Sequence, residues 1–358
     1  MTLTAKRMMS TLLASFATFV VCVAALELVG WLMRGTDRPP VSNRYYLMSG
    51  SNGVFRNVDG IFVYKPHSTI TSRVWFENRG GFANEYSYQF RTNNLGLVQT
   101  TDVDPGKQSL LVLGDSFTEG TGSPPWFDDF SRRFADVGLQ PVNGGLLGTG
   151  FLNWVRLDKY LRNQGLTASK VLVVFISDDM SRKQWNFQGG ILQCLEDWLS
   201  CEGWENYYGL PPLDQERAFL AKIKAFREQA RVVDGNLRES LKRILPTTAE
   251  KYRGLIRLFS RRAGRASVDH LISTYGERVA FVHIPQKHEV EEGYDHDGVL
   301  SQQTIREAGA TLYDGRMMCG LTAEDYFPID QHLNAQGSQK LSECLLRVYE
   351  QWTAAVRQ

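Results

Sequence analysis

The chain has 358 residues, of which 43% are apolar and 22% are charged, a balance that is typical of a globular protein and excludes a wholly disordered one. The length suits one large domain with a smaller accessory region. Lysine and arginine together number 40 against 39 acidic residues, so the composition does not indicate a dedicated nucleic-acid surface.

An apolar segment near the amino terminus is the first predicted element. Residues 11–33 carry no charge except Glu27, and a helix of this length is just sufficient to span a bilayer. Lys6 and Arg7 before the segment favour a cytoplasmic amino terminus. We therefore expect a single retained membrane anchor, with a cleaved signal peptide or a buried soluble helix as the alternatives. An anchor or a signal peptide would place the rest of the chain on the periplasmic or other extracytoplasmic side, where disulfides form.

The chain is predicted to divide into three regions. Residues 1–35 form the anchor or signal segment, 36–105 a juxtamembrane β-rich region, and 106–358 the main domain. Within the β-rich region, residues 61–64 are a β-favouring run and residues 85–91 alternate polar and aromatic side chains, both of which are typical of strands.

Strands and helices alternate in the main domain. Short apolar runs at residues 110–113, 171–176 and 279–284 are typical of buried strands, and predicted helices separate them. This alternation predicts an α/β fold in which a parallel sheet carries helices on both faces. A helical and aromatic insertion is expected at about 181–260, and an amphipathic helix over about 338–356 ends the chain.

Five cysteines are present, and Cys22 lies in the apolar segment. The remaining four permit three pairings. Nearness in the sequence favours Cys194 with Cys201 and Cys319 with Cys344, and four unpaired thiols are the alternative. No CxxC motif occurs, which disfavours a zinc ribbon or a thioredoxin-like site.

The loop at 288–297 is rich in His, Glu and Asp. It lacks the HExxH spacing that a zinc protease places on a helix. We therefore interpret it as a solvated acidic loop, and the sequence predicts neither a metal nor another cofactor.

A serine lies directly after the first predicted strand of the main domain. Gly114 ends the strand, and Asp115 and Ser116 follow at its carboxyl end, which is the edge where open α/β sheets bind ligands. A serine on a tight, glycine-flanked turn is a candidate nucleophile, and Asp115 beside it is a candidate substrate-site residue. The alternative is a strand-to-helix turn in which one of these two side chains caps the helix.

A second group of polar residues lies just before the last helix. A serine hydroxyl needs a base within hydrogen-bond reach, and the base must be oriented by a third group. His332 is the predicted base, and Asp330 is predicted to orient it by accepting a hydrogen bond from the other ring nitrogen.

The order Gly114-Asp115-Ser116, then Asp330 and His332, resembles the signature blocks of the SGNH (GDSL-type) hydrolases. The resemblance covers roughly residues 108–350. It implies a three-layer α/β/α sandwich with a mostly parallel, flavodoxin-like sheet, and acyl-ester chemistry through an acyl-enzyme. Asp-x-His in place of the commoner Asp-x-x-His is similar to the membrane-anchored branch related to alginate O-acetyltransferase.

The resemblance also implies an oxyanion hole. The backbone N–H of Ser116 is one predicted donor, and that of Gly148, in a glycine-rich loop, is the second. The family's third block normally holds an Asn whose amide donates, but Asp178 stands there in this chain, and an ionised carboxylate cannot donate. Asp178 is therefore expected either to be protonated or to turn away and position substrate or Arg182, with Asn153 as another candidate donor.

We predict a serine esterase or O-acyltransferase. Its expected substrate is an ester-linked acyl group on cell-surface or exported polysaccharide, or another small ester, and exopolysaccharide assembly proteins are candidate partners. The alternative is a catalytically impaired SGNH-like module that binds polysaccharide or an assembly partner. Asp178 supports this alternative, whereas the complete set of Ser116, His332 and Asp330 supports an enzyme.

Overall fold

The computed structural model of the protein describes most of the chain between Arg44 and Val356, together with a short N-terminal helix. The described residues are 14–25, 27, 44–51, 53–78, 81–134, 137–182, 216–218, 220, 221, 224, 225 and 246–356. The contacts divide the chain into two compact units, one of Met1–Ser42 with Ala221–Phe259 and the other of Asn43–Leu220 with Ser260–Gln358. The predicted β-rich region and most of the predicted main domain thus share the larger unit.

In the smaller unit, residues 14–25 are helical. Within the part of the chain that the structure describes, no helix combines the length and the apolar character needed to cross a membrane. Apart from Glu27, the remainder of the apolar stretch at 11–33 lies outside the described residues, as do most of the predicted insertion and both Cys194 and Cys201.

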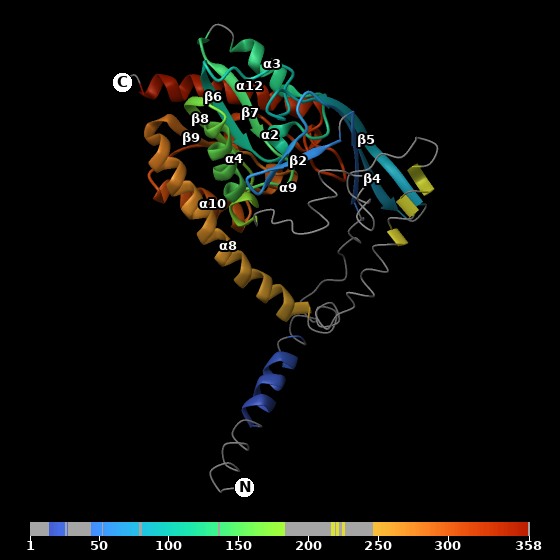
Figure 1. Cartoon of the computed structure of the whole chain (residues 1–358). Coiled ribbons are helices and arrows are strands. Elements are labelled where there is room, and N and C mark those ends of the chain that lie inside the picture. The colour runs from blue at the N-terminus through green and yellow to red at the C-terminus, as the bar shows by residue number, and fades with distance from the viewer. Residues whose placement is uncertain are drawn as a thin grey trace. The chain divides into compact units, whose positions relative to one another are not determined.

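A five-stranded parallel sheet forms the centre of the larger unit (Figure 1). Its strands are β6 (Gln108–Gly114), β7 (Gln140–Gly145), β8 (Thr167–Phe175), β9 (Val279–His283) and β10 (Thr311–Asp314). They lie in the order β10-β9-β8-β6-β7, and each neighbouring pair is parallel. This is the flavodoxin-like order, in which the strand order reverses beside the first strand of the sheet and the ligand crevice lies at the carboxyl ends there.

Helices cover both faces of this sheet (Figure 1). They are α3 (Trp126–Arg133), α4 (Phe151–Asn163), the later part of α8 (Pro246–Tyr275), α10 (His296–Glu307) and α12 (Ala335–Val356). Leu111 and Leu113 of β6 pack in one apolar cluster with α4, α8 and α10, whereas Leu110 and Val112 pack in a second cluster with α3 and α12. Alternate side chains of a strand point to opposite faces, so the structure confirms the predicted α/β class and forms three layers.

The strands of the β-rich region form two separate sheets. One is a three-stranded antiparallel sheet of β1 (Arg44–Gly50), β4 (Thr69–Asn78) and β5 (Gly81–Arg91), with β4 in the middle. The other is a hairpin of β2 (Phe55–Val58) and β3 (Ile61–Tyr64). Asp59 and Gly60 join its strands with φ values of 51° and 78°, the left-handed pair that a two-residue hairpin turn requires.

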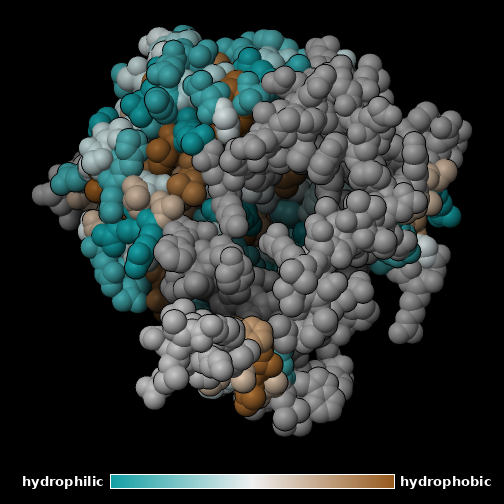
Figure 2. Space-filling model, turned by 60° about the horizontal axis from the view of Figure 1, so that its bottom comes forward, coloured by the Kyte–Doolittle hydropathy of each residue, from teal (hydrophilic) through white to brown (hydrophobic). Residues whose placement is uncertain are grey.

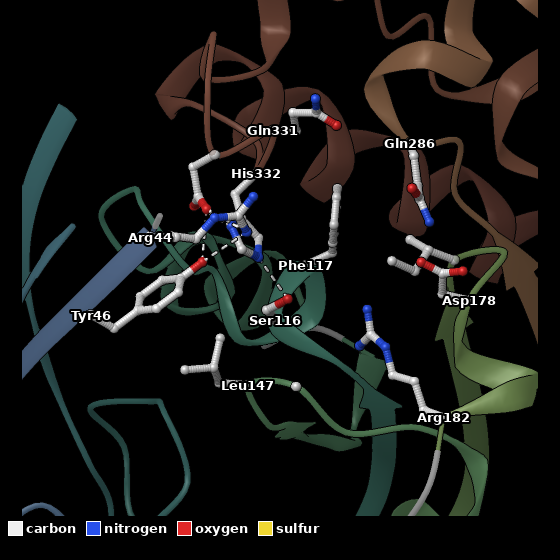
Figure 3. A pocket seen from close by; sticks show the side chains of 13 residues that line it. Arg44, Tyr46, Ser116, Phe117, Leu147, Asp178, Arg182, Gln286, Gln331 and His332 are labelled. Carbon is white, nitrogen blue, oxygen red and sulfur yellow. Dashed lines mark hydrogen bonds and ion pairs between the residues drawn. The ribbon is translucent and has the colours of Figure 1, made fainter. Parts of the chain in front are cut away.

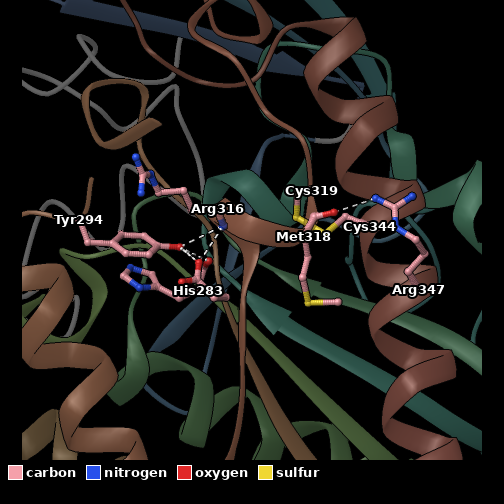
Figure 4. The surroundings of a disulfide bond; sticks show 8 residues. His283, Tyr294, Arg316, Met318, Cys319, Cys344 and Arg347 are labelled. Atoms are coloured by element: carbon pink, nitrogen blue, oxygen red, sulfur yellow. Dashed lines mark hydrogen bonds between the residues drawn. A yellow bond between two sulfur atoms is a disulfide. The ribbon is translucent and has the colours of Figure 1, made fainter. Parts of the chain in front are cut away.

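Three short helices complete the described part of the larger unit. They are α2 (Ser116–Glu119), α9 (Lys287–Glu292) and α11 (Gly315–Met318). A disulfide joins Cys319, at the end of α11, to Cys344 in α12 (Figure 4). This is one of the two pairings that the sequence favours, and the described Cys22 is unpaired.

The face of the molecule drawn in Figure 2 is mostly hydrophilic over the coloured, described residues, with small separate apolar areas. In the described part of the larger unit, the large apolar side chains that are exposed are Val137, Val299, Met317 and Ile329. They lie far apart in the sequence, and single exposed apolar residues are ordinary on a protein surface.

Candidate active site

The turn after β6 presents Ser116 at the carboxyl edge of the sheet. Asp115 is the N-cap of α2, and its Oδ1 accepts the backbone N–H of Phe117 at 2.9 Å. Gly114 is needed for this turn, because an added Cβ would lie 1.9 Å from Thr118 Oγ1 and 2.7 Å from the carbonyl oxygen of Val174. Asp115 thus caps helix α2, as the alternative interpretation of the sequence predicted. Its side chain does not line the cleft described below.

Ser116, His332 and Asp330 form a continuous hydrogen-bonded chain, and Figure 3 shows Ser116 and His332 facing each other. The Ser116 Oγ lies 2.8 Å from His332 Nε2, and His332 Nδ1 contacts Asp330 Oδ2. Because a carboxylate only accepts, the proton is assigned to Nδ1, which leaves Nε2 to accept the Ser116 O–H. Gln331, which lies between Asp330 and His332 in the sequence, has a φ of 65°. This left-handed conformation is uncommon for a residue other than glycine.

The Asp330 carboxylate is held by side chains from the β-rich region. The Tyr46 hydroxyl donates to Oδ1 at 2.7 Å, Arg44 Nη1 lies 2.9 Å from the same oxygen, and the Tyr86 hydroxyl donates to Oδ2. Burial by itself would raise the pKa of Asp330, but the charge and hydrogen bond of His332, with Arg44 and Tyr86, lower that pKa below its ordinary value. Asp330 thus stays ionised, as the orienting group must.

A second acidic side chain fixes the backbone of the same loop. Glu85 of β5 accepts the backbone N–H of Ile329 at 2.8 Å and that of Asp330 at 2.9 Å. The sequence analysis missed Arg44, Tyr46, Glu85 and Tyr86 as site residues. The alternation at 85–91 was the only local signal, and it indicates a strand without indicating what that strand contacts.

The glycine-rich loop after β7 lies beside Ser116. Asn143 is buried and braces the loop, because its amide donates to the carbonyl of Val98 at 2.8 Å and its Oδ1 accepts the N–H of Gly145 at 2.9 Å. Gly148 has a φ of 70° and lines the cleft. The Ser116 N–H stands at the first position of α2, where a helix offers no acceptor for it.

Glu119, on α2, links that loop to the nucleophile turn. Its Oε2 accepts the backbone N–H of Leu147 at 2.6 Å, and its Oε1 accepts the hydroxyls of Tyr64 at 3.0 Å and Thr121 at 3.2 Å. Burial raises the pKa of this carboxyl to about 7, although these three hydrogen bonds oppose the rise. Glu119 therefore fixes the backbone immediately before Gly148.

The remaining predicted residues divide between the cleft and the core. Asp178 lines the cleft and is exposed, and its carboxylate makes no hydrogen bond or ion pair with any described residue. Asn153 lies buried in α4 and is not among the cleft residues, so the structure does not bring this candidate donor to Ser116. Arg182 also lines the cleft, where its Nη1 contacts Asp115.

These groups surround a cleft of about 420 Å³ (Figure 3). It is lined by Arg44, Tyr46, Ser116, Phe117, Leu147, Gly148, Ile176, Asp178, Arg182, Gln286, Asp330, Gln331 and His332. A cleft of this size can admit a small molecule beside the Ser116 hydroxyl.

The prediction of a solvated loop at 288–297 is wrong, because α9 covers Lys287–Glu292, α10 begins at His296 and Glu289 is buried. The ligand atoms of His288, Glu289 and Asp295 lie within 4.8 Å of one another. Glu289 is already engaged, because it accepts the Ser177 hydroxyl and the backbone N–H groups of Gln286 and Asp295. The carboxylate thus serves the capping box of α9.

No protein-family model and no curated protein sequence matches the chain. Solved structures with some likeness include an acetyl xylan esterase from Geobacillus stearothermophilus, with a TM-score of 0.31, 14% identity, and coverage of 68% of this chain and 94% of that one. A protein from Desulfitobacterium hafniense DCB-2 assigned to the G-D-S-L lipolytic family has a TM-score of 0.33 and 13% identity, with coverage of 67% and 99%. A carbohydrate esterase described as having divergent catalytic and non-catalytic binding functions has a TM-score of 0.29 and 12% identity, with coverage of 87% and 98%. Likenesses this distant carry no functional conclusion, so the function has to be argued from the side chains of the site.

Proposed function

We propose that the protein is a serine ester hydrolase of the SGNH type. The observation that carries this proposal is the 2.8 Å contact between Ser116 Oγ and His332 Nε2, with His332 Nδ1 held on the Asp330 carboxylate. A hydroxyl paired with an oriented imidazole is the arrangement that activates a serine for acyl transfer.

The proposed reaction has two halves that share one base. In the first, His332 Nε2 takes the hydroxyl proton as Ser116 Oγ bonds to the carbonyl carbon, and the imidazolium then returns that proton to the leaving alcohol. In the second half, water or an acceptor hydroxyl loses a proton to Nε2 as it attacks the acyl-enzyme, and the proton returns to Ser116. Hydrolysis and O-acyl transfer differ only in the acceptor of this second half.

The finer parts of the proposal concern substrate and location. We propose ester-linked acyl groups of cell-surface or exported polysaccharide as substrates, with the larger unit held on the periplasmic side by an anchor at 11–33. The uncharged stretch in that segment and the disulfide between Cys319 and Cys344 support this location. Exopolysaccharide assembly proteins would then be neighbours of the enzyme.

A non-catalytic binding module is the second candidate function. The specific observation that favours it is Asp178, an exposed carboxylate in the cleft where a side-chain donor is expected. Such a module would bind an acylated carbohydrate or an assembly partner without turning it over.

Labelling of the full chain with a fluorophosphonate tests the two candidates. We expect the wild-type protein to be labelled and to hydrolyse p-nitrophenyl acetate, and Ser116→Ala and His332→Ala to lose both properties while they remain folded. Ser273→Ala and His288→Ala change an exposed serine and an exposed histidine and serve as matched controls that should behave as the wild type. A folded wild-type protein that is neither labelled nor active would favour the binding module.

A further inference from the structure

Arg182 lies on the side of Ser116 away from His332 (Figure 3). Its Nη1 lies 2.9 Å from Asp115 Oδ2, and the Ser116 Oγ lies 3.4 Å from that same oxygen. One carboxylate oxygen therefore stands between the guanidinium and the nucleophile. Because His332 lies on the opposite side of Ser116, a substrate oxygen directed away from His332 would face the side of the cleft where Arg182 lies.

Two hydrogen-bond acceptors and one further carboxylate oxygen hold one end of this guanidinium. Nη1 lies 2.9 Å from Asp115 Oδ2, from Asp179 Oδ1 and from the carbonyl oxygen of Thr149. These oxygens come from the nucleophile turn, the end of β8 and the glycine-rich loop, the three segments that surround the reacting atoms. The side chain is thus held in place before any substrate arrives.

The other donors of Arg182 are left for a ligand. A guanidinium carries five N–H groups, and every contact of this side chain with described residues uses Nη1. The side chain is 25% exposed, and Figure 3 shows the guanidinium directed into the cleft between Ser116 and Asp178. Nε–H and the Nη2 hydrogens are therefore available in the cleft.

The charges around Arg182 keep it protonated. Burial by itself would lower the pKa of Arg182, but Asp179 and Asp115 raise that pKa above its ordinary value. Asp178 cannot act as a donor in its ionised form. Arg182 is consequently the charged donor on the side of the cleft where negative charge would develop.

Given the proposed ester chemistry, on which this inference rests, we propose that Arg182 is a catalytic residue that donates to the oxyanion. As His332 takes the proton of Ser116, the carbonyl oxygen gains negative charge, and the unpaired N–H groups of Arg182 and the Ser116 backbone N–H donate to it. Arg182 neither gains nor loses a proton. When the intermediate collapses, the electron pair on the oxyanion re-forms the C=O bond, the bond to the leaving oxygen breaks, and that oxygen takes the proton from His332. A preorganised donor of this kind acts mainly on the rate of the chemical step.

Steady-state kinetics of the full chain with Arg182→Gln and Arg182→Lys test the proposal. We expect Arg182→Gln to lower kcat by about 10²- to 10³-fold with KM changed by less than about 3-fold, and Arg182→Lys, which keeps the charge, to retain a larger part of kcat. The affinity for a boronic acid, which forms a tetrahedral adduct on Ser116, should fall in parallel with kcat/KM.

Arg162→Gln is the matched control, because Arg162 also contacts a buried carboxylate, that of Asp158 at 3.0 Å, but in α4 and away from the cleft. It should alter stability without altering kcat. Wild-type kcat in a folded Arg182→Gln variant would overturn the proposal, and so would a loss confined to KM and thermal stability with unchanged boronic acid affinity. An inactive, unlabelled wild-type protein would instead overturn the proposed function itself.

Discussion

The buried carboxyl of Glu119 has a pKa well above its ordinary value. It is fully enclosed, yet its carboxyl accepts three hydrogen bonds, one of them from the backbone before Gly148. A group whose pKa differs between the folded and unfolded chain makes stability depend on pH. The residue therefore links pH to the geometry of the glycine-rich loop.

Glu119→Gln should remove a loss of stability at high pH. Burial raises the pKa from 4.5 to about 7 in the folded chain, so between these values the folded state holds a proton that the unfolded state has released. Stability of the wild type thus falls as pH rises through this window, by up to roughly 3 kcal/mol, and the loss is complete above it. The free energy of unfolding in urea at pH 5 and pH 8 measures the effect.

The wild type should lose more stability than Glu119→Gln between these two pH values. Glu350→Gln, at an exposed position of α12, should follow the wild type. Identical pH dependence in the wild type and Glu119→Gln would show that Glu119 does not titrate in this range.

At the scale of elements, strands β1 and β5 have the least expected role. Region 36–105 was predicted as a separate juxtamembrane region, yet these two strands supply the hydroxyls that meet Asp330 across 284 and 244 residues of sequence. The parallel sheet follows from apolar runs that alternate with helices. Its flavodoxin-like strand order and the meeting of Ser116 with His332 are what the resemblance of the motifs implies. The contacts of Tyr46 and Tyr86 follow from neither, because strand periodicity shows which faces alternate but not which distant loop a face covers. The sequence likewise did not indicate Arg182 as a hydrogen-bond donor in the cleft, because it does not show which distant groups a side chain contacts.

Tyr86→Phe should slow the chemistry without unfolding the protein. The change removes an O–H that donates to the ionised Asp330, and hydrogen bonds to charged groups contribute about 1.5–3 kcal/mol. We expect kcat to fall by about 10-fold or more, since 1.4 kcal/mol corresponds to a factor of ten. The pKa of Asp330 should also rise toward its ordinary value, because the carboxylate loses a hydrogen bond that stabilises its charged form.

A pH–rate profile measures the fall in kcat, and an NMR titration of the Asp330 carboxyl measures the rise of its pKa. Tyr45→Phe is the control, because Tyr45 is equally buried on β1 but its hydroxyl faces Glu77, at 3.4 Å, instead of Asp330. If Tyr86→Phe and Tyr45→Phe have superimposable profiles, the Tyr86 hydroxyl has no part in holding Asp330.

Over the whole molecule, the larger unit is closed by links between distant parts of the chain. The last helix packs on the sheet beside α3, and the disulfide ties it to the segment after α11. Because Cys319 and Cys344 are 25 residues apart, the bond restricts the unfolded chain over a loop of moderate length.

Reduction of this disulfide should destabilise the larger unit by about 3 kcal/mol. Urea unfolding with and without a reductant measures the difference, and Cys319→Ser with Cys344→Ser should reproduce the reduced state. Cys22→Ser is the control, because Cys22 is exposed and unpaired. A reductant that leaves the unfolding midpoint unchanged would contradict the stabilising role.

The hydrogen bond between Tyr46 and Asp330 joins residues that the ribosome makes at very different times. The ribosome makes residue 46 long before residue 330, and the two groups are 284 positions apart. Ser116 and His332 are 216 positions apart. Ser116 is therefore made well before its proposed base, His332. The serine cannot be activated until the loop before α12 has left the ribosomal exit tunnel. A chain that ends before this loop would contain all five strands of the parallel sheet and would lack the proposed acyl chemistry.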